Sequence, residues 1–172
     1  MRLYNNQAPV LAEEIIRALL RSEDLEILAE NEQEAQLDVE SVIREFVRMD
    51  REITERAREM VHESGGQLSV GRVKRQLAKE KRFRIGDEGV GYIIDQLIET
   101  FLHSQFVEEV FAEDHDIRRR LAPIIRKYGS LQNDLDEEVR NKIKNIEEGT
   151  AVWDVEYQKV MENIKRKKNL ED

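Results

Sequence analysis

The sequence contains no cysteine, and this excludes a disulfide framework, a thiolate nucleophile and a sulfur-based zinc site. Proline occurs twice, and aromatic residues make up 6% of the chain. No stretch of roughly 18 residues is apolar and uncharged throughout, so we expect no membrane-spanning helix. The opening MRLYNNQAPVLAEE lacks the apolar centre of a signal peptide. These absences predict a soluble, cytoplasmic protein.

The chain is rich in charge. Charged residues make up 38% of its 172 residues and hydrophobic residues 40%, which is enough apolar content to build a core. An excess of Glu, Arg and Lys favours helices with ion pairs four residues apart, and it is also typical of thermostable proteins. The formal net charge of -9 argues against a protein coated in nucleic acid.

Apolar residues recur at helical spacing, and no alternating run is long enough for a convincing strand. The predicted class is all-α. We expect Asp50 to cap a new helix, and Pro123 to kink or break one because proline removes a helical hydrogen bond. The helices expected from these patterns cover residues 9–21, 32–48, 51–65, 69 onward, 90–101, 117–128, 139–149 and 154 onward.

The second half of the chain repeats the first. LDEEV at 135–139 answers MDREI at 49–53, YIIDQLI at 92–98 answers EIIRALL at 14–20, and IIRKY at 124–128 answers VIREF at 42–46. Between the halves, three glycines within residues 84–91 indicate a boundary. The repeat predicts two similar small helical domains in tandem, residues 1–85 and 86–172. In an alternative arrangement, a helix runs through the boundary as the rod of a dumbbell.

Three segments resemble a known family. They are Met1-Arg2-Leu3, LDEEVR at 135–140, and YQKVMENIKRK at 157–167. Together they are similar to the bacterial domain-of-unknown-function family 507, whose members are short helical proteins, often a single unit of about half this length. The resemblance implies a helical fold, a bacterial origin and a tandem pair of units, and it implies no activity. The first half departs from the pattern, because Gly66 and Val70 stand where the second half has Trp153 and Tyr157.

No residue pattern points to catalysis, a cofactor or a metal. The glycines at 86, 89 and 91 lack the preceding strand of a nucleotide-binding loop, so they are interpreted as a linker. The three histidines lack the spacing that places metal ligands on one helix face. His115 lies between Asp114 and Asp116, where helix capping is a better interpretation than a weak metal site. Neighbouring carboxylates are interpreted as solvated helix faces, and we therefore expect a protein that is not an enzyme.

The last helix of each half is basic although the chain as a whole is acidic. The preferred interpretation is a solvated face that pairs with carboxylates of the second and third helices, in a non-catalytic protein-interaction or structural module with a protein partner. The alternative is a nucleic-acid-associated module that binds phosphates through these helices. The candidate partner-binding or polyanion-binding residues are Arg72, Arg75, Lys79 and Arg82 in the first half, and Lys159, Lys165 and Arg166 in the second.

Overall fold

The computed structural model describes residues 1–65, 68–147 and 150–170, and it is mostly helical, as predicted. Two short strands and two single 3₁₀ turns, Asn5–Gln7 and Ala29–Asn31, complete the described structure. The strands are β1 (Leu25–Glu26) and β2 (Glu109–Val110). The helices are α1 (Ala8–Arg21), α2 (Glu32–Glu63), α3 (Val70–Glu80), α4 (Glu88–His103), α5 (Asp114–Gly129), α6 (Leu131–Lys142) and α7 (Ala151–Lys167).

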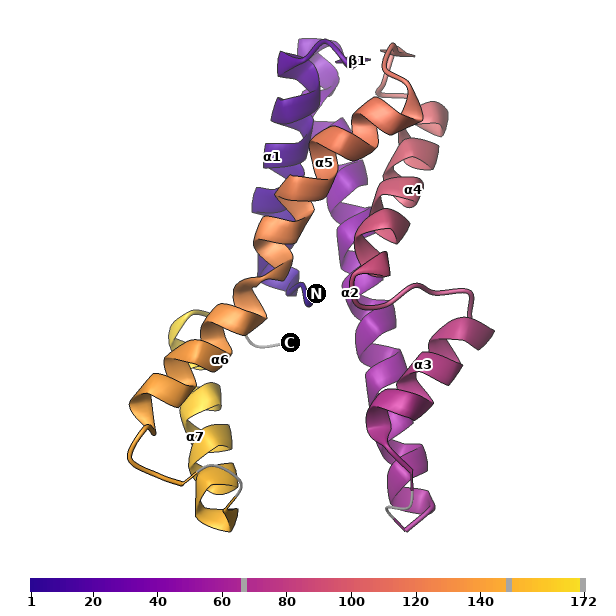
Figure 1. Ribbon diagram of the computed structural model, residues 1–172. Coiled ribbons are helices and arrows are strands. Elements are labelled where there is room, and N and C mark those ends of the chain that lie inside the picture. The colour runs from indigo at the N-terminus through magenta and orange to yellow at the C-terminus, as the bar shows by residue number, and fades with distance from the viewer. Residues whose placement is uncertain (66–67, 148–149, 171–172) are drawn as a thin grey trace.

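Four helices, α1, α2, α4 and α5, form the body of the molecule (Figure 1). Helix α1 packs on α2 and α5, and α4 packs on the same two helices. Each helix has an apolar stripe that its partner from the same half does not cover alone, so the stripes of both halves meet in one core. The largest fully buried side chains of this core are Leu11, Ile15, Leu19, Ile43, Ile53, Ile93, Ile94, Leu97, Ile117, Leu121 and Ile125.

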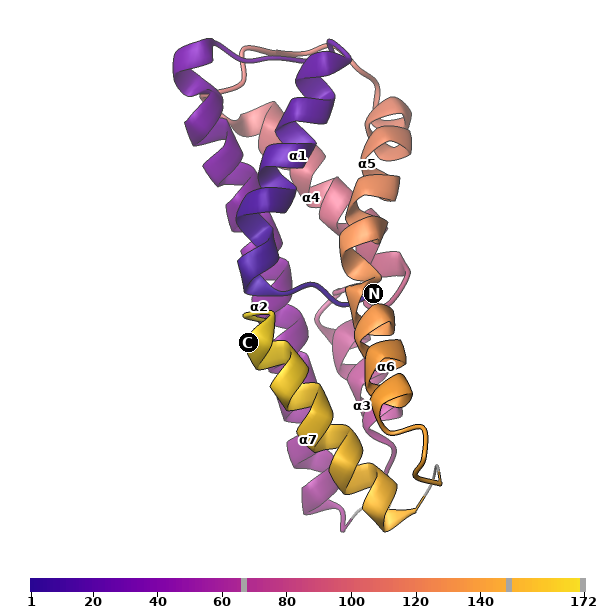
Figure 2. The same cartoon turned by 90° about the vertical axis from the view of Figure 1, so that its left-hand side faces the viewer.

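Two pairs of helices extend from the body as legs (Figures 1 and 2). The second half of α2 packs against α3 in the α2–α3 leg, and α6 packs against α7 in the α6–α7 leg. The α6–α7 leg has its own buried cluster, made of Tyr4, Leu135, Val139, Ile143, Met161, Ile164 and Leu170. Helix α2 belongs to both the body and a leg, since its 32 residues span roughly 48 Å.

The connectors before α2 and before α5 pair with each other. Strands β1 and β2 are antiparallel, with Leu25 opposite Val110 and Glu26 opposite Glu109. The side chain of Asp24, which is 6% exposed, accepts hydrogen bonds from Arg120 of α5. A buried carboxylate needs such a partner, so this ion pair fixes the two connectors to the end of the body.

The residues before α1 join the body to the α6–α7 leg. Leu3 is buried in the core of the body, whereas Tyr4 is fully buried in the cluster of the leg. The backbone N–H of Arg2 donates to the carbonyl of Gly129 at 3.3 Å. The side chain of Met1 lies against Gly129 and leaves no room for a Cβ atom there. Residues 1–7 are called the N-terminal segment below.

Several expected helix boundaries are wrong. The helices expected at 32–48 and 51–65 are one continuous helix, α2. Asp50 lies inside it and forms an ion pair with Lys74 at 2.7 Å instead of capping a new helix. Pro123 does not break α5, because one missing N–H bond is outweighed by Leu121 and Ile125, which are fully buried on either side.

The third and fourth helices of the second half also differ from expectation. Helix α6 ends at Lys142, before the expected end at residue 149. Helix α7 begins at Ala151 rather than at Asp154, and the hydroxyl of Thr150 caps it by accepting from the N–H of Trp153 at 3.2 Å. The helix expected at 51–65 ends at Glu63, and Gly65 follows it with a φ of 68°, whereas Gly66 and Gly149 lie outside the described residues. Between α3 and α4 the chain is not helical, so no rod joins the two halves there.

Candidate functional site

The first candidate surface is the outer side of α3. Arg72, Arg75, Lys79 and Arg82 follow one another at spacings of three and four residues, and all four are exposed. Val73 and Ala78 are buried on the opposite side of the helix. Within the described part of the chain, none of the four cations pairs with a carboxylate. These four residues are called the basic face of α3 below.

The other cations of this segment are paired. Lys74 bridges to Asp50, and Lys81 to Glu52, both on α2. Arg84 pairs with Asp95 of α4 and lies over the ring of Tyr92, 5.6 Å from its centroid. Neutralisation by carboxylates of the second and third helices, which we expected for this basic segment, therefore holds for Lys74 and Lys81, whereas Arg84 is neutralised by α4 instead. It is wrong for the basic face, which points away from α2.

The corresponding residues of α7 are in a different situation. Lys159 pairs with Glu156 at 3.4 Å, and the ammonium of Lys165 lies 5.6 Å from the centre of the Tyr4 ring. Arg166 also has an interaction partner. The two basic helices are matched in sequence, but α7 does not reproduce the open basic face of α3.

A hollow at the end of α3 extends the basic face toward α4. Its cations are Arg75, Lys79, Arg82 and Arg84, and Asp87 and Glu88 form its acidic border. Arg82 has a φ of 54° and ends the helix in the left-handed conformation, so that the N–H of Phe83 reaches the carbonyl of Ala78 at 2.8 Å. Phe83 is thereby placed in the core at 3% exposure, with its ring 5.0 Å from Phe46 and Tyr92.

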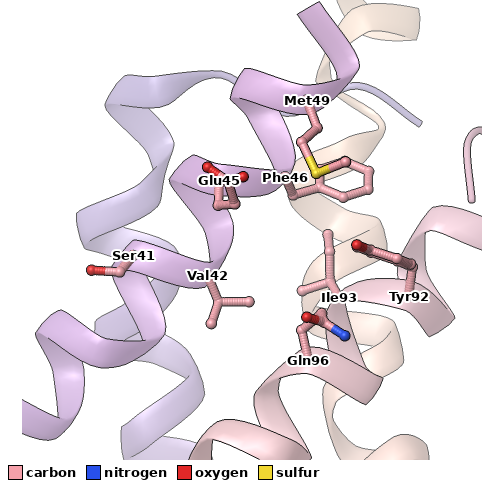
Figure 3. A pocket seen from close by; sticks show the side chains of 8 residues that line it. All are labelled: Ser41, Val42, Glu45, Phe46, Met49, Tyr92, Ile93 and Gln96. Atoms are coloured by element: carbon pink, nitrogen blue, oxygen red, sulfur yellow. The ribbon is translucent and has the colours of Figure 1, made fainter. Parts of the chain in front are cut away.

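The second candidate surface is an apolar groove of about 260 Å³ between α2 and α4, called the α2–α4 groove below (Figure 3). Phe46 and Ile93 are buried in it, whereas Val42, Met49 and Tyr92 are half-buried. Its polar residues are Ser41, Glu45 and Gln96. Sequence reasoning treated Val42 and Phe46 only as core positions. The feature of the sequence that indicates the groove is the width of the apolar stripe on α2, which is broader than one partner helix can cover.

The matching seam between α1 and α5 is polar instead. Glu14 of α1 accepts a hydrogen bond from the hydroxyl of Tyr128 at 2.7 Å and one from Lys127 at 3.1 Å. The hydrogen bond from Tyr128 is the main cause that lowers the pKa of Glu14. Burial, followed by the bond to Glu14, raises the pKa of Tyr128 to about 12. Where α5 has Lys127 and Tyr128, α2 has Glu45 and Phe46, and the α2–α4 groove therefore stays apolar.

Across the described residues, no three His, Asp or Glu side chains are grouped in a way that suits a metal ion. His115 lies 3.4 Å from Asp116, and both residues belong to the first turn of α5, which Glu113 precedes as N-cap. Capping by the two aspartates is not observed as a side-chain hydrogen bond. Among the described helices, none combines the length and the apolar character needed to cross a membrane.

The fold and its two surfaces define a helical protein with a four-helix body, two legs, an apolar groove and a basic face. The family model described as "Protein of unknown function (DUF507)" matches residues 1–170, so the chain belongs to this family. The resemblance drawn from the segments at 1–3, 135–140 and 157–167 is thus confirmed. The match covers both halves of the chain in one span. No curated protein matches the sequence.

Proposed function

We propose that this protein is a non-catalytic interaction module, and that the α2–α4 groove binds an amphipathic helix of a protein partner. The observation that carries the proposal is the groove itself: half-buried Val42, Met49 and Tyr92 surround a buried floor and are bordered by polar side chains. An apolar centre inside a polar rim is the usual composition of a protein interface.

The size of the groove favours a side chain over a free small molecule. Small-molecule sites enclose roughly 300–1,000 Å³ and bury most of the ligand. The α2–α4 groove holds about 260 Å³, and three of its lining side chains, Val42, Met49 and Tyr92, are half-buried rather than enclosed. It suits one or two large apolar anchors from a helix laid between α2 and α4. Met49 adds an unbranched, adaptable wall of the kind common at such surfaces.

The charge of the molecule indicates the kind of helix that fits. The net charge is -9, and Glu45 stands exposed beside the groove, where Arg48 holds its carboxylate at 2.7 Å. A partner helix with two apolar residues three or four positions apart, flanked by basic residues, complements both the groove and the field around it.

The proposal can be tested with a photocrosslinker attached to a single introduced cysteine, because the chain has no cysteine of its own. A photocrosslinker attached to Ser41→Cys lies beside the groove, and one attached to Val10→Cys, at an exposed position of α1, is the matched control. We expect Ser41→Cys to crosslink one partner through a basic amphipathic helix, and Val42→Asp to abolish that crosslink while circular dichroism shows that the protein remains folded. Crosslinking equal to the Val10→Cys control, or unchanged by Val42→Asp, contradicts the proposal.

We also propose that residues 1–85 and 86–172 are duplicated units, and that the groove is a surface kept apolar in one copy. Matched ion pairs support this: Lys81 with Glu52, and Lys168 with Glu138, join positions that correspond in the repeat. Matched helix ends support it too, because Arg82 and Asn169 are both left-handed, with φ of 54° and 53°, and each precedes a buried apolar residue. In a duplicated module, one of two equivalent helix contacts can change in sequence while the other continues to stabilise the fold.

We further infer that the protein is thermostable and works in the cytoplasm of a bacterium. The support is the absence of cysteine and the dense ion pairing of α2, where Arg44, Arg48 and Arg51 each bridge to a glutamate of the same helix. Networks of this kind stabilise proteins most at high temperature. Calorimetry should give a Tm above the range of about 45–65 °C that is typical of mesophilic domains.

A further inference from the structure

The basic face of α3 is a second surface, separate from the α2–α4 groove. Its four cations are exposed and lack carboxylate partners within the described residues, in a chain of net charge -9. Four arginines of α2 provide the contrast, since Arg44, Arg48, Arg51 and Arg56 each pair with a glutamate on their own helix. Unpaired like charges on one face repel one another, and a multivalent anion relieves that repulsion.

The chemistry of the face favours phosphate. Three of the four residues are arginines, whose planar guanidinium donates two parallel hydrogen bonds to a phosphate group. From Arg72 to Lys79 the cations span roughly 10 Å of α3, at 1.5 Å per residue, and Arg82 follows just beyond the end of the helix. Such a row matches the repeated charges of a polyanion better than a single small anion.

A protein partner fits this surface less well than a polyanion does. None of the large exposed hydrophobic side chains of the described chain belongs to α3. The exposed residues between the cations are Gln76, Glu80 and Lys81. A protein interface depends on a few apolar or aromatic anchors that this face lacks, whereas sequence-independent binding of nucleic acid needs only cations.

The aromatic residues decide which part of a nucleic acid is contacted. Phe83, the ring next to the face, is 3% exposed and packed against Phe46 and Tyr92, so it offers no surface for base stacking. Tyr157 of α7 is stacked on Trp153, and its hydroxyl donates to Asp136 at 2.5 Å. The contacts available at α3 are therefore with the phosphodiester backbone.

We propose that Arg72, Arg75, Lys79 and Arg82 bind the phosphodiester backbone of a nucleic acid without reading its sequence. The site lies on α3, and α7 does not duplicate it, because Lys159 and Lys165 are engaged within the protein. Asp87 and Glu88 border the hollow at the end of α3 and limit the site on that side by repelling phosphate.

The test is fluorescence anisotropy of the full chain with a labelled duplex RNA, a duplex DNA and a single-stranded RNA, each over a range of salt. We expect wild-type binding whose log-log salt slope reflects about four phosphate contacts, roughly 3 to 4 in magnitude. Replacing Arg72, Arg75, Lys79 and Arg82 with glutamine should weaken binding by more than about tenfold at low salt and flatten that slope. The three probes distinguish RNA from DNA and duplex from single strand as the bound form.

The control variant replaces Arg44, Arg48, Arg51 and Arg56 of α2 with glutamine, which removes the same number of charges from paired positions. It should keep most of the affinity. A third variant, Asp87→Asn with Glu88→Gln, should tighten binding, and it tests the site even if the α3 variant fails to fold.

Three results overturn the proposal: no binding by wild-type protein at low salt, equal losses in the α3 and α2 variants, or equal binding of polyglutamate. The last result would assign the face to an acidic protein. None of these outcomes bears on the α2–α4 groove, which contributes no residue to the basic face.

Discussion

At the scale of single residues, Ile143 tests the packing of the α6–α7 leg. It is 5% exposed and belongs to the buried cluster of that leg, at the C-terminal end of α6. Ile143→Ala should lower the free energy of unfolding by about 2–5 kcal/mol, because it removes buried methyl groups and leaves a cavity. Urea denaturation measures the loss. Val155→Ala, at a position that is 65% exposed, should change stability by less than about 0.5 kcal/mol.

The bond between Tyr128 and Glu14 predicts a pH dependence. The pKa of Tyr128 is raised to about 12 from an ordinary 10.0, so its contribution to stability is complete below pH 10.0 and is lost as pH rises through about 12. The pKa of Glu14 is lowered from 4.5, so its contribution is present above pH 4.5 and is lost as pH falls further. Tyr128→Phe should therefore be less stable than wild type at neutral pH, with a difference that shrinks at both extremes.

Urea denaturation from acid to alkaline pH measures this difference. Tyr92→Phe is the control, since the hydroxyl of Tyr92 takes part in no hydrogen bond within the described residues. A constant difference between Tyr128→Phe and wild type at every pH would show that the lost bond does not depend on the charge of Glu14.

Burial of single residues was largely predictable from the sequence, and their partners were not. Ile53 and Ala57, and likewise Val139 and Ile143, are four residues apart, a spacing that predicts one buried helix face, and all four are buried. The same spacing placed the basic face of α3 opposite Val73. Which cations would be neutralised depends on how α3 is rotated against α2, and that rotation is set by tertiary packing. Lys74 forms an ion pair with Asp50. Arg75 is the next residue in the chain, but it points elsewhere and has no such partner.

At the scale of the elements, the N-terminal segment holds the α6–α7 leg to the body. Tyr4 is fully buried in the cluster of that leg. Tyr4→Ala should cost about 3–5 kcal/mol, as expected for removal of a large buried side chain. Hydrogen exchange should then accelerate in α6 and α7, while α1 and α4 keep their protection. Uniform acceleration in all helices would show that the leg and the body unfold as one unit.

Helix types were predicted better than helix ends. Asp50 is predicted to cap a new helix because aspartate is favoured at helix N-caps. No glycine or proline lies between residues 48 and 51, however, and α2 continues through them. Pro123 is predicted to kink or break its helix because of the intrinsic penalty of proline, which takes no account of the buried residues around it. In both places tertiary packing outweighed a local preference. The α2–α4 groove depends on the continuity of α2, and it was not predicted.

At the scale of the whole molecule, the shared core makes each half dependent on the other. Helices α1 and α2 bury part of their apolar surface against α5 and α4, which belong to the second half. Fragment 1–85 alone should therefore be unfolded or self-associated, and so should fragment 86–172. Mixing them should restore cooperative unfolding, measured by circular dichroism with size-exclusion chromatography. A monomeric, cooperatively folded 1–85 fragment would contradict this and would support independent domains.

The repeat in the sequence indicated two similar units but not their association. Matched segments such as VIREF at 42–46 and IIRKY at 124–128 predict that similar helices form in both halves. They carry no information on whether each unit closes its own core. Whether a unit closes its own core depends on the width of its apolar stripes and on the antiparallel pairing of β1 with β2. Each of these strands has two residues, which is too short for an alternating pattern to be detected in the sequence.

The position of the N-terminal segment also has a consequence for folding kinetics. The hydrogen bond from Gln7 to Tyr128 spans 121 residues, and the one from Asn6 to Asn169 spans 163. Contacts between residues so distant in sequence carry a large loop-closure entropy, so they form after the helices of the body have assembled. Tyr4→Ala should therefore leave the folding rate in stopped-flow experiments almost unchanged and increase the unfolding rate. The N-terminal segment would then determine how long the folded molecule lasts rather than how quickly it forms.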